Sequence, residues 1–100
     1  MNVSFDFDGT LSNKKGRELL AAEIANGNTI FIITRRRKSF SESVYAVAKE
    51  FKIPRSRVIF TDGEMKWHSI LKYKIDLHYD NNPDELKLIR DNTSAKTKLV

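Results

Sequence analysis

The chain of 100 residues contains no cysteine, only two prolines and only four glycines. The lack of cysteine excludes a disulfide scaffold, a zinc site built from thiolates and a cysteine nucleophile. It also fits a reducing compartment. Any chemistry that the protein performs must therefore use oxygen and nitrogen groups.

Long apolar runs are also missing, because a stretch such as Ile30–Ile33 is far shorter than the roughly 20 residues that a membrane-spanning helix needs. The N-terminal stretch MNVSFDFDGT carries an acidic pair where a signal peptide would need a basic and then an apolar segment. No linker, repeat or low-complexity segment interrupts the chain. We therefore expect one soluble, cytoplasmic domain over residues 1–100, with no membrane partner.

Acidic residues are outnumbered, with 13 Asp and Glu against 18 Lys and Arg, so the formal net charge is +5. The basic residues cluster at Arg35–Lys38, between Lys49 and Arg57, and near the C-terminus. Such an excess favours an anionic ligand. For any single cluster, a solvated basic face is the alternative interpretation.

Short apolar runs rich in β-forming residues alternate with segments of helical character. The predicted strands are Val3–Phe7, Thr29–Ile33, Arg57–Phe60 and Ile75–Tyr79, with a short edge strand over Lys98–Val100. The predicted helices are Lys15–Asn26, a segment from Ser39 to before Pro54, Glu64–Lys72, and a last helix from Pro83 to about Asp91. This alternation predicts a three-layer α/β fold, an open and mostly parallel sheet of four or five strands with helices on both faces.

Two of the predicted helices have clear start signals. The stretch Ser39–Glu42 matches a capping box. Asn82 can cap the last helix, Pro83 fits its first position, and Asp84 and Glu85 bring negative charge to the end that the helix dipole favours. We therefore expect helices to open at these two stretches.

A polar or acidic residue stands at the end of each of the four main strands. These residues are Asp6 and Asp8, Thr34, Thr61 with Asp62, and Asp80. In an open parallel α/β sheet, ligands bind outside the carboxyl ends of the strands. We therefore expect these residues to converge on one crevice, although they are scattered in the sequence.

Asp6 and Asp8 lie two residues apart, so an extended strand would point both side chains to the same side. Two like charges at that separation repel each other unless a cation lies between them. Mg²⁺ suits such oxygen ligands, and it takes one or two carboxylates together with water and phosphate oxygens. We expect Asp80 to supply the remaining carboxylate. An ordinary turn that binds nothing is the alternative for a lone Asp-x-Asp.

Thr34 follows an apolar strand, and its hydroxyl could bind a phosphoryl oxygen together with the backbone N–H groups that follow, beginning at Arg35. A lysine would balance the phosphate charge, and Lys66 and Lys72 are the candidates. We prefer Lys66, because it lies near the start of its helix and so near the carboxyl end of the preceding strand. Each residue alone has an ordinary structural explanation, but the set describes phosphoryl-transfer machinery.

With these residues in this order, the sequence resembles the haloacid dehalogenase (HAD) superfamily of aspartyl-phosphate phosphohydrolases. The stretch Asp6-Phe7-Asp8-Gly9-Thr10 resembles its first motif, Asp-x-Asp-Gly-Thr. Thr34, Lys66 and Asp80 resemble its second, third and fourth motifs. The resemblance extends over nearly the whole chain, from residue 3 to about residue 88.

The resemblance implies a phosphoric monoester hydrolase with a defined role for each of these residues. Asp6 would attack phosphorus and form a covalent aspartyl-phosphate, and Asp8 would protonate the leaving oxygen and then activate water. Mg²⁺ would be held by Asp6, the backbone carbonyl of Asp8, and Asp80. Thr34 and Lys66 would hold the transferring phosphoryl group.

Many members of the superfamily carry a cap domain inserted after the first or second motif. Here about 25 residues separate Asp8 from Thr34 and about 30 separate Thr34 from Lys66, which leaves no room for a domain. The resemblance is therefore to capless members, which act on large substrates or borrow a neighbouring subunit of a homo-oligomer as a lid. After the fourth motif, Asn81 could be a neutral group beside the metal, and Asp84 could contact it through water.

The basic run Arg35–Lys38 favours a polyanionic substrate, because Arg engages phosphate bidentately. Trp67 and Tyr79 could stack on a base, with core packing as the alternative. We interpret His68 and His78 as structural. Three hypotheses follow: a phosphatase acting on a nucleotide or other small phosphorylated compound, an end-processing phosphatase of nucleic acid, and a non-catalytic module that binds phosphate or nucleic acid.

Overall fold

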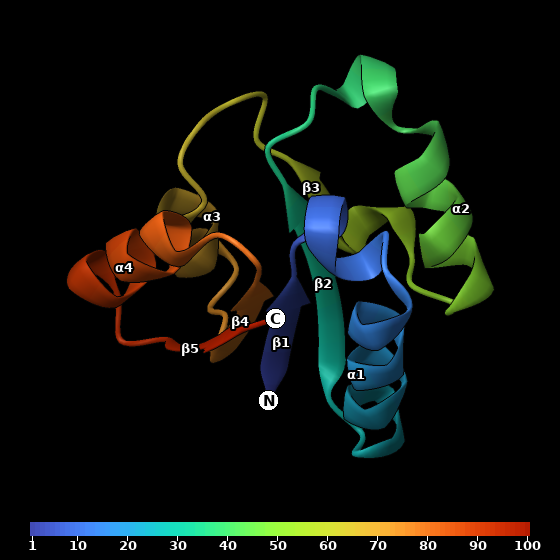
Figure 1. Ribbon diagram of the computed structural model, residues 1–100, viewed down its shortest axis with the longest axis horizontal. Helices are drawn as coiled ribbons and strands as arrows, with labels where there is room; N and C mark the ends of the chain where they lie inside the picture. The colour runs from blue at the N-terminus through green and yellow to red at the C-terminus, as the bar shows by residue number, and fades with distance from the viewer.

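One five-stranded, all-parallel sheet organises the protein, which we describe from a computed structural model of residues 1–100 (Figure 1). The strands are β1 (Asn2–Phe5), β2 (Thr29–Thr34), β3 (Val58–Phe60), β4 (Leu77–Asp80) and β5 (Lys96–Leu99). All four neighbouring pairs are parallel, and the order across the sheet is β3-β2-β1-β4-β5. The predicted parallel α/β sheet is confirmed, and its fifth strand begins two residues earlier than expected.

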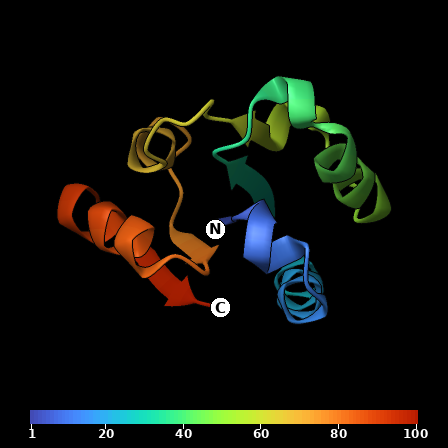
Figure 2. The same cartoon turned by 45° about the horizontal axis from the view of Figure 1, so that its top comes forward.

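Four helices cover the two faces of this sheet. They are α1 (Lys14–Ala25), α2 (Glu42–Glu50), α3 (Trp67–Lys72) and α4 (Pro83–Asn92). Figure 2 shows the blue and green α1 and α2 on one side and the yellow and orange α3 and α4 on the other. Side chains along β2 alternate accordingly, since Ile32 lies in the apolar layer of Leu20, and Ile33 in the layer of Ile70 and Ile89. Burial on both faces explains the nearly continuous apolar run in this strand.

The order of the strands reverses between β1 and β4. The chain proceeds from β1 outward to β2 and β3, and then returns to the other side of β1 to form β4 and β5. Asp6 extends the β1–β4 pairing by one step, because its N–H donates to the backbone oxygen of Tyr79 at 2.9 Å. Ligands of open α/β sheets bind at such a reversal, outside the carboxyl ends of the strands. Asp6 and Asp80 both lie there.

The chain leaves β1 through a wide turn rather than a longer strand. β1 ends at Phe5, two residues before the predicted end, and Phe7–Leu11 forms a π-type turn that is kinked at Asp8 and Gly9. Gly9 has a φ of 77°, in the left-handed region that favours glycine. A β-carbon at this position would also lie 2.1 Å from Nδ2 of Asn81. The left-handed turn therefore requires glycine, and a larger residue would also force the Asn81 side chain to move.

The predicted start of α4 is confirmed. Oδ1 of Asn82 accepts hydrogen bonds from the backbone N–H groups of Asp84 at 3.0 Å and Glu85 at 3.3 Å, and Pro83 is the first helical residue. This cap fixes the direction in which α4 leaves the carboxyl end of β4.

The predicted capping box before α2 is wrong. Lys38–Phe40 forms a short 3₁₀ turn, and α2 begins at Glu42 with no side-chain cap. A local contact stabilises this turn, because Nη1 of Arg36 donates to the backbone oxygen of Phe40 at 3.1 Å. Helix α3 likewise begins at Trp67, three residues later than expected.

None of the four helices combines the length and the apolar composition needed to cross a bilayer.

Candidate active site

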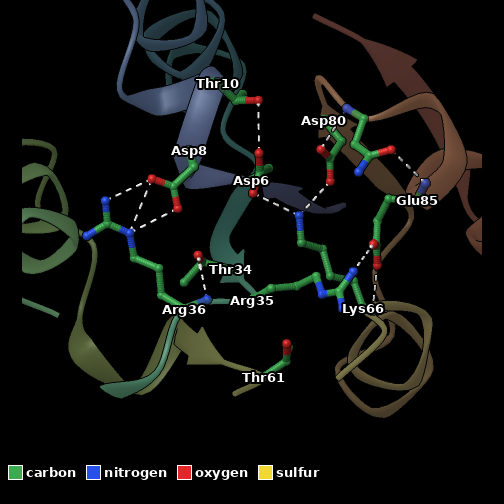
Figure 3. A network of polar contacts seen from close by, with 12 residues as sticks. Asp6, Asp8, Thr10, Thr34, Arg35, Arg36, Thr61, Lys66, Asp80 and Glu85 are labelled. Carbon is green, nitrogen blue, oxygen red and sulfur yellow. Dashed lines mark hydrogen bonds and ion pairs between the residues drawn. The ribbon is translucent and has the colours of Figure 1, made fainter. Parts of the chain in front are cut away.

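Three charged side chains meet at the β1–β4 reversal. Nζ of Lys66 donates to Oδ1 of Asp6 at 2.8 Å and to Oδ2 of Asp80 at 2.6 Å (Figure 3). Asp6 directly follows β1, Asp80 ends β4, and Lys66 directly precedes α3. All three residues are at most 5% exposed. The structure thus brings together three of the predicted site residues from distant parts of the sequence.

The other candidate lysine lies elsewhere. Lys72 is the last residue of α3, is exposed, and has its ammonium 5.4 Å from the centre of the Tyr73 ring. Lys66, in contrast, lies at the helix end that faces the carboxyl edge of the sheet. Of the two lysines, only Lys66 contacts the carboxylates.

A buried carboxylate from α4 holds the backbone of Lys66 in place. Oε1 of Glu85, which is 3% exposed, accepts a hydrogen bond from the N–H of Lys66 at 2.7 Å. Its other oxygen lies 3.5 Å from Nη1 of Arg35. The sequence does not indicate this role, because the position of Glu85 in the first turn of α4 is enough to explain its charge. The signal was its place beside Leu86 on the buried stripe of that helix.

A neutral histidine completes the buried cluster. Nε2 of His78 lies 2.9 Å from Oδ2 of Asp80, and Nδ1 lies 2.6 Å from the hydroxyl of Ser4 on β1. Because a carboxylate only accepts, we assign the ring hydrogen to Nε2, and Nδ1 then accepts from Ser4. Burial lowers the pKa of His78, which keeps the ring neutral. The interpretation of His78 as structural did not include its contact with Asp80.

The pKa of Asp6 is raised above the ordinary value for aspartate, whereas the pKa of Asp80 is lowered. Burial raises the pKa of Asp6 to about 6, although the charge of Lys66 opposes this. Burial also acts to raise the pKa of Asp80, but the hydrogen bond from His78 and the charge of Lys66 outweigh it and hold the pKa at about 2. Burial alone would lower the pKa of Lys66, but the two carboxylates keep it above its usual value. Lys66 and Asp80 are therefore charged at neutral pH.

Asp8 points away from this cluster, contrary to the prediction that Asp6 and Asp8 share one side around a cation. Its carboxylate accepts from Nε of Arg36 at 2.9 Å and from Nη2 at 2.8 Å (Figure 3). The prediction assumed an extended strand through Asp8, but β1 ends at Phe5 and the turn redirects the side chain. Asp6 therefore pairs with Lys66, and Asp8 pairs with Arg36. The hydrogen bond from Arg36 lowers the pKa of Asp8.

Two of the predicted phosphate-binding residues lie where β2 ends, Thr34 as its last residue and Arg35 at the start of the following loop. Thr34 is 1% exposed, and its hydroxyl oxygen accepts from the N–H of Arg36 at 3.2 Å. Nη2 of Arg35 donates to the backbone oxygen of Gly63 at 2.6 Å. The N–H of Gly63 donates in turn to the backbone oxygen of Arg35 at 2.9 Å. These contacts join the loops after β2 and β3 into one rim beside the charged cluster.

The aromatic residues proposed to stack on a base are engaged elsewhere. The ring of Tyr79 lies in the core, stacked 4.5 Å from Phe5, and its hydroxyl donates to Glu23 at 2.8 Å. Trp67 packs against the apolar layer of α3 and α4 and stacks 3.7 Å from His68. Core packing, the alternative interpretation, therefore holds for Tyr79.

Oxygen atoms suited to a hard cation also lie at this edge. The side-chain amide of Asn81 is 3.1 Å from Oδ2 of Asp6 and 3.1 Å from the backbone oxygen of Asp8, and it donates to both when its nitrogen faces them. No group of three or more His, Asp or Glu side chains is arranged to hold a metal ion. Two carboxylates and one carbonyl are nevertheless a donor set that fits Mg²⁺, which completes its shell with water and phosphate oxygens. Asp84 is exposed and lies outside this set.

No model of a known protein family matches the chain, and no curated protein matches it. Inferences about its function therefore depend on the residues and the geometry described above.

Proposed function

We propose that the protein is a Mg²⁺-dependent phosphohydrolase of the HAD type, which hydrolyses a phosphate monoester through a covalent aspartyl-phosphate at Asp6. The observation that carries this proposal is the position of the Lys66 ammonium, held between the buried carboxylates of Asp6 and Asp80 at the β1–β4 reversal. A nucleophile, a phosphate-binding cation and a further carboxylate are the groups that phosphoryl transfer requires at one point.

In the first step, an oxygen of Asp6 forms a bond to phosphorus while the bond from phosphorus to the ester oxygen breaks. Asp8 donates a proton to that departing oxygen. In the second step, Asp8 removes a proton from water, the water oxygen bonds to phosphorus, and the bond to Asp6 breaks. Inorganic phosphate leaves, and both carboxylates return to their starting states.

Asp8 can serve as the acid only after it separates from Arg36. Its pKa is lowered by the hydrogen bond from Arg36, and a lowered pKa opposes protonation. The carboxylate is also half exposed, so rotation toward the substrate meets little packing. An anionic substrate would compete for Arg36 and free Asp8 to take up a proton. Substrate binding and preparation of the acid are therefore linked in this proposal.

Asp6, the backbone oxygen of Asp8, and Asp80 are the residues that would hold Mg²⁺. When bound, the ion would offset the negative charge of Asp6 toward an anionic substrate and stabilise charge on the transferring group. Lys66 and the hydroxyl of Thr34 would bind oxygens of that group. The backbone N–H and the guanidinium of Arg35 would bind the remaining phosphate charge. A nucleotide or another small phosphorylated compound is the substrate class that we propose.

The direct test is phosphate release from a panel of monoesters, including p-nitrophenyl phosphate, nucleoside monophosphates and sugar phosphates. We expect hydrolysis in the presence of Mg²⁺, its loss on chelation, and its return when Mg²⁺ is added again. Turnover that persists in chelator would contradict the metal requirement. If the protein binds these compounds but hydrolyses none of them, the non-catalytic alternative is correct.

Removal of the Asp8 partner should raise the pKa of Asp8. In Arg36→Met, the hydrogen bonds that stabilise the ionised carboxylate are lost, so protonation should begin at higher pH than in the parent protein. The measurement is the carboxyl ¹³C shift of Asp8 against pH in the metal-free protein. Arg37→Met is the matched control, because Arg37 pairs with Asp62 at 3.2 Å and not with Asp8. An unchanged titration in Arg36→Met would show that the ion pair is absent in solution.

A further inference from the structure

A recess lies along β3, one of the two edge strands of the sheet, and none of its lining residues belongs to the charged cluster around Lys66. Its volume is about 1010 Å³, at the upper end of the range of about 300–1,000 Å³ that is usual for small-molecule sites. We call it the edge groove. Six of its lining residues matter here, three cationic and three aromatic: Arg37, Lys38, Arg55, Tyr45, Phe60 and Tyr73.

The aromatic rings come from three different elements and are all half-buried. Tyr45 on α2 meets Phe60 of β3 edge to face, with ring centres 5.5 Å apart. Tyr73, directly after α3, lies 5.6 Å from Phe31 and packs against the other apolar layer. Each ring is fixed by the core on one side and lines the groove on the other. Fixed rings of this kind are stacking surfaces for bases.

The cations of the edge groove are exposed and exceed its acidic residues. Arg37, Lys38 and Arg55 face a single carboxylate, Asp62, which pairs with Arg37 while both side chains are at least 70% exposed. Such an exposed pair is weak and leaves both groups available. The guanidinium of Arg55 already lies over the Tyr45 ring, 4.1 Å from its centre, so it covers one face of that ring. A merely solvated basic face would not require aromatic rings between its charges.

The loop after β2 connects the edge groove with the candidate active site. Arg35 contacts Glu85 and Arg36 contacts Asp8, and the next two residues of the same loop line the groove. The loop after β3 is attached to this loop, because the N–H of Asp62 donates to the backbone oxygen of Arg36 at 3.4 Å. A ligand with one phosphate at Thr34 would therefore have its neighbouring phosphates beside Arg37 and Lys38.

We propose that the edge groove binds a single-stranded nucleic acid whose terminal phosphate enters the candidate active site. The groove supplies cations for the phosphate backbone and ring faces for the bases, with no arrangement of side chains that would read base edges, so binding should depend little on sequence. Removal of the terminal phosphate rests on the function proposed above. Binding of the strand does not.

Fluorescence anisotropy with labelled octathymidylate, with and without a 3′ or 5′ phosphate, tests strand binding without turnover. We expect the triple variant Arg37→Ala/Lys38→Ala/Arg55→Ala to bind at least about tenfold more weakly than the parent protein. The matched control is Lys15→Ala/Lys87→Ala/Lys96→Ala, which removes the same charge from α1, α4 and β5, away from β3. Equal weakening in both variants would mean that only net charge matters, and would overturn the proposal.

The salt dependence of binding and the substitution of an aromatic residue distinguish a structured binding site from non-specific electrostatic attraction. Single strands lose affinity with a log–log slope of about −0.7 per neutralised phosphate, so the slope should become shallower by about 2 in the groove variant. Tyr73→Leu should weaken binding by roughly tenfold through lost stacking, with its folded state checked by thermal melting. Polyglutamate of equal charge should compete poorly. Displacement of the strand by polyglutamate at equal charge would overturn the proposal.

Kinetics distinguish failure of this inference from failure of the proposed function. We expect kcat/KM to be at least tenfold higher for a phosphorylated oligonucleotide than for the mononucleotide, and this advantage to disappear in the groove variant. Equal values for the two substrates would overturn the edge groove and leave the phosphatase standing. If the strand binds through the groove but no phosphate is released, the binding site stands and the proposed function falls.

Discussion

Asp6→Asn is expected to reduce phosphate release by a factor on the order of 10³ or more while the protein stays folded. The amide oxygen that replaces the carboxylate is a poor nucleophile, so the covalent intermediate cannot form. The fold should persist, because Asn retains the shape of Asp6 and can still accept a hydrogen bond from Lys66, which keeps Asp80 as its ionic partner. Steady-state turnover and thermal melting are the two measurements.

Asp62→Asn is the matched control for this substitution. Asp62 lies on the same edge of the sheet, but its carboxylate is 70% exposed and pairs only with Arg37. Its replacement should leave turnover of a small monoester within about twofold of the parent value. Undiminished turnover by Asp6→Asn would refute the proposed nucleophile.

Beryllium fluoride, which mimics the phosphoryl group on an aspartate, should be found bonded to Asp6 in a crystal grown with Mg²⁺.

Lys66→Met should have the largest effect on stability, because it leaves two neighbouring carboxylates in a buried site without their shared cation. Removing one partner of a buried ion pair costs about 3–5 kcal/mol, and we expect a loss of that order in the free energy of unfolding at neutral pH without metal. Mg²⁺ should then stabilise the variant more than the parent protein, because a divalent cation would replace the lost charge. Denaturant unfolding with and without Mg²⁺ measures both effects, and turnover should fall as well.

Lys72→Met is the control for this variant. It removes the same charge from the other end of α3, where the ammonium is exposed, and should change the free energy of unfolding by less than about 1 kcal/mol. A metal-free Lys66→Met protein as stable as the parent would show that the ammonium does not hold the two carboxylates together. Equal stabilisation of both proteins by Mg²⁺ would place the ion elsewhere.

Features that depend on simple periodicity could be predicted from the sequence. The alternation of short apolar runs with helical segments predicted a parallel sheet between two helical layers. The run from Phe31 to Ile33 is apolar at every position because both faces of β2 are covered. The meeting of Asp6 with Asp80 followed from a topological rule, since the carboxyl ends of parallel strands share one edge. The roles assigned to these residues in phosphoryl transfer stay predictions.

Features that depend on the end of a strand could not be predicted. The side chain of Asp8 would lie beside that of Asp6 only if β1 continued as an extended strand through Asp8. The strand instead ends at Phe5, and the turn begins at Phe7. The competing partner, Arg36, lies 28 residues further along the chain. Local sequence carries no information on which of the neighbouring arginines reaches back to Asp8.

The polar residues behind the site were hidden by simpler explanations. Glu85 looked like a helix-start residue, and its contact with the backbone of Lys66 exists only because α3 and α4 lie on the same face. His78 and Asp80 lie two residues apart in one strand, and His78 pairs in register with Ser4 on β1. Period-two alternation applied to both strands would have placed these three side chains in one line.

The ammonium of Lys66 affects how the protein folds. Oδ2 of Asp80 already accepts from both Lys66 and His78, and Oδ1 accepts from the N–H of Asn82 at 3.1 Å. Lys66 is thus an internal counterion that the two carboxylates share, and both oxygens of Asp80 are hydrogen-bonded within the chain. The newly synthesised chain can complete its fold before any external cation arrives. If Mg²⁺ binds as proposed, folding would not depend on its supply, and the metal-free protein would already be stable.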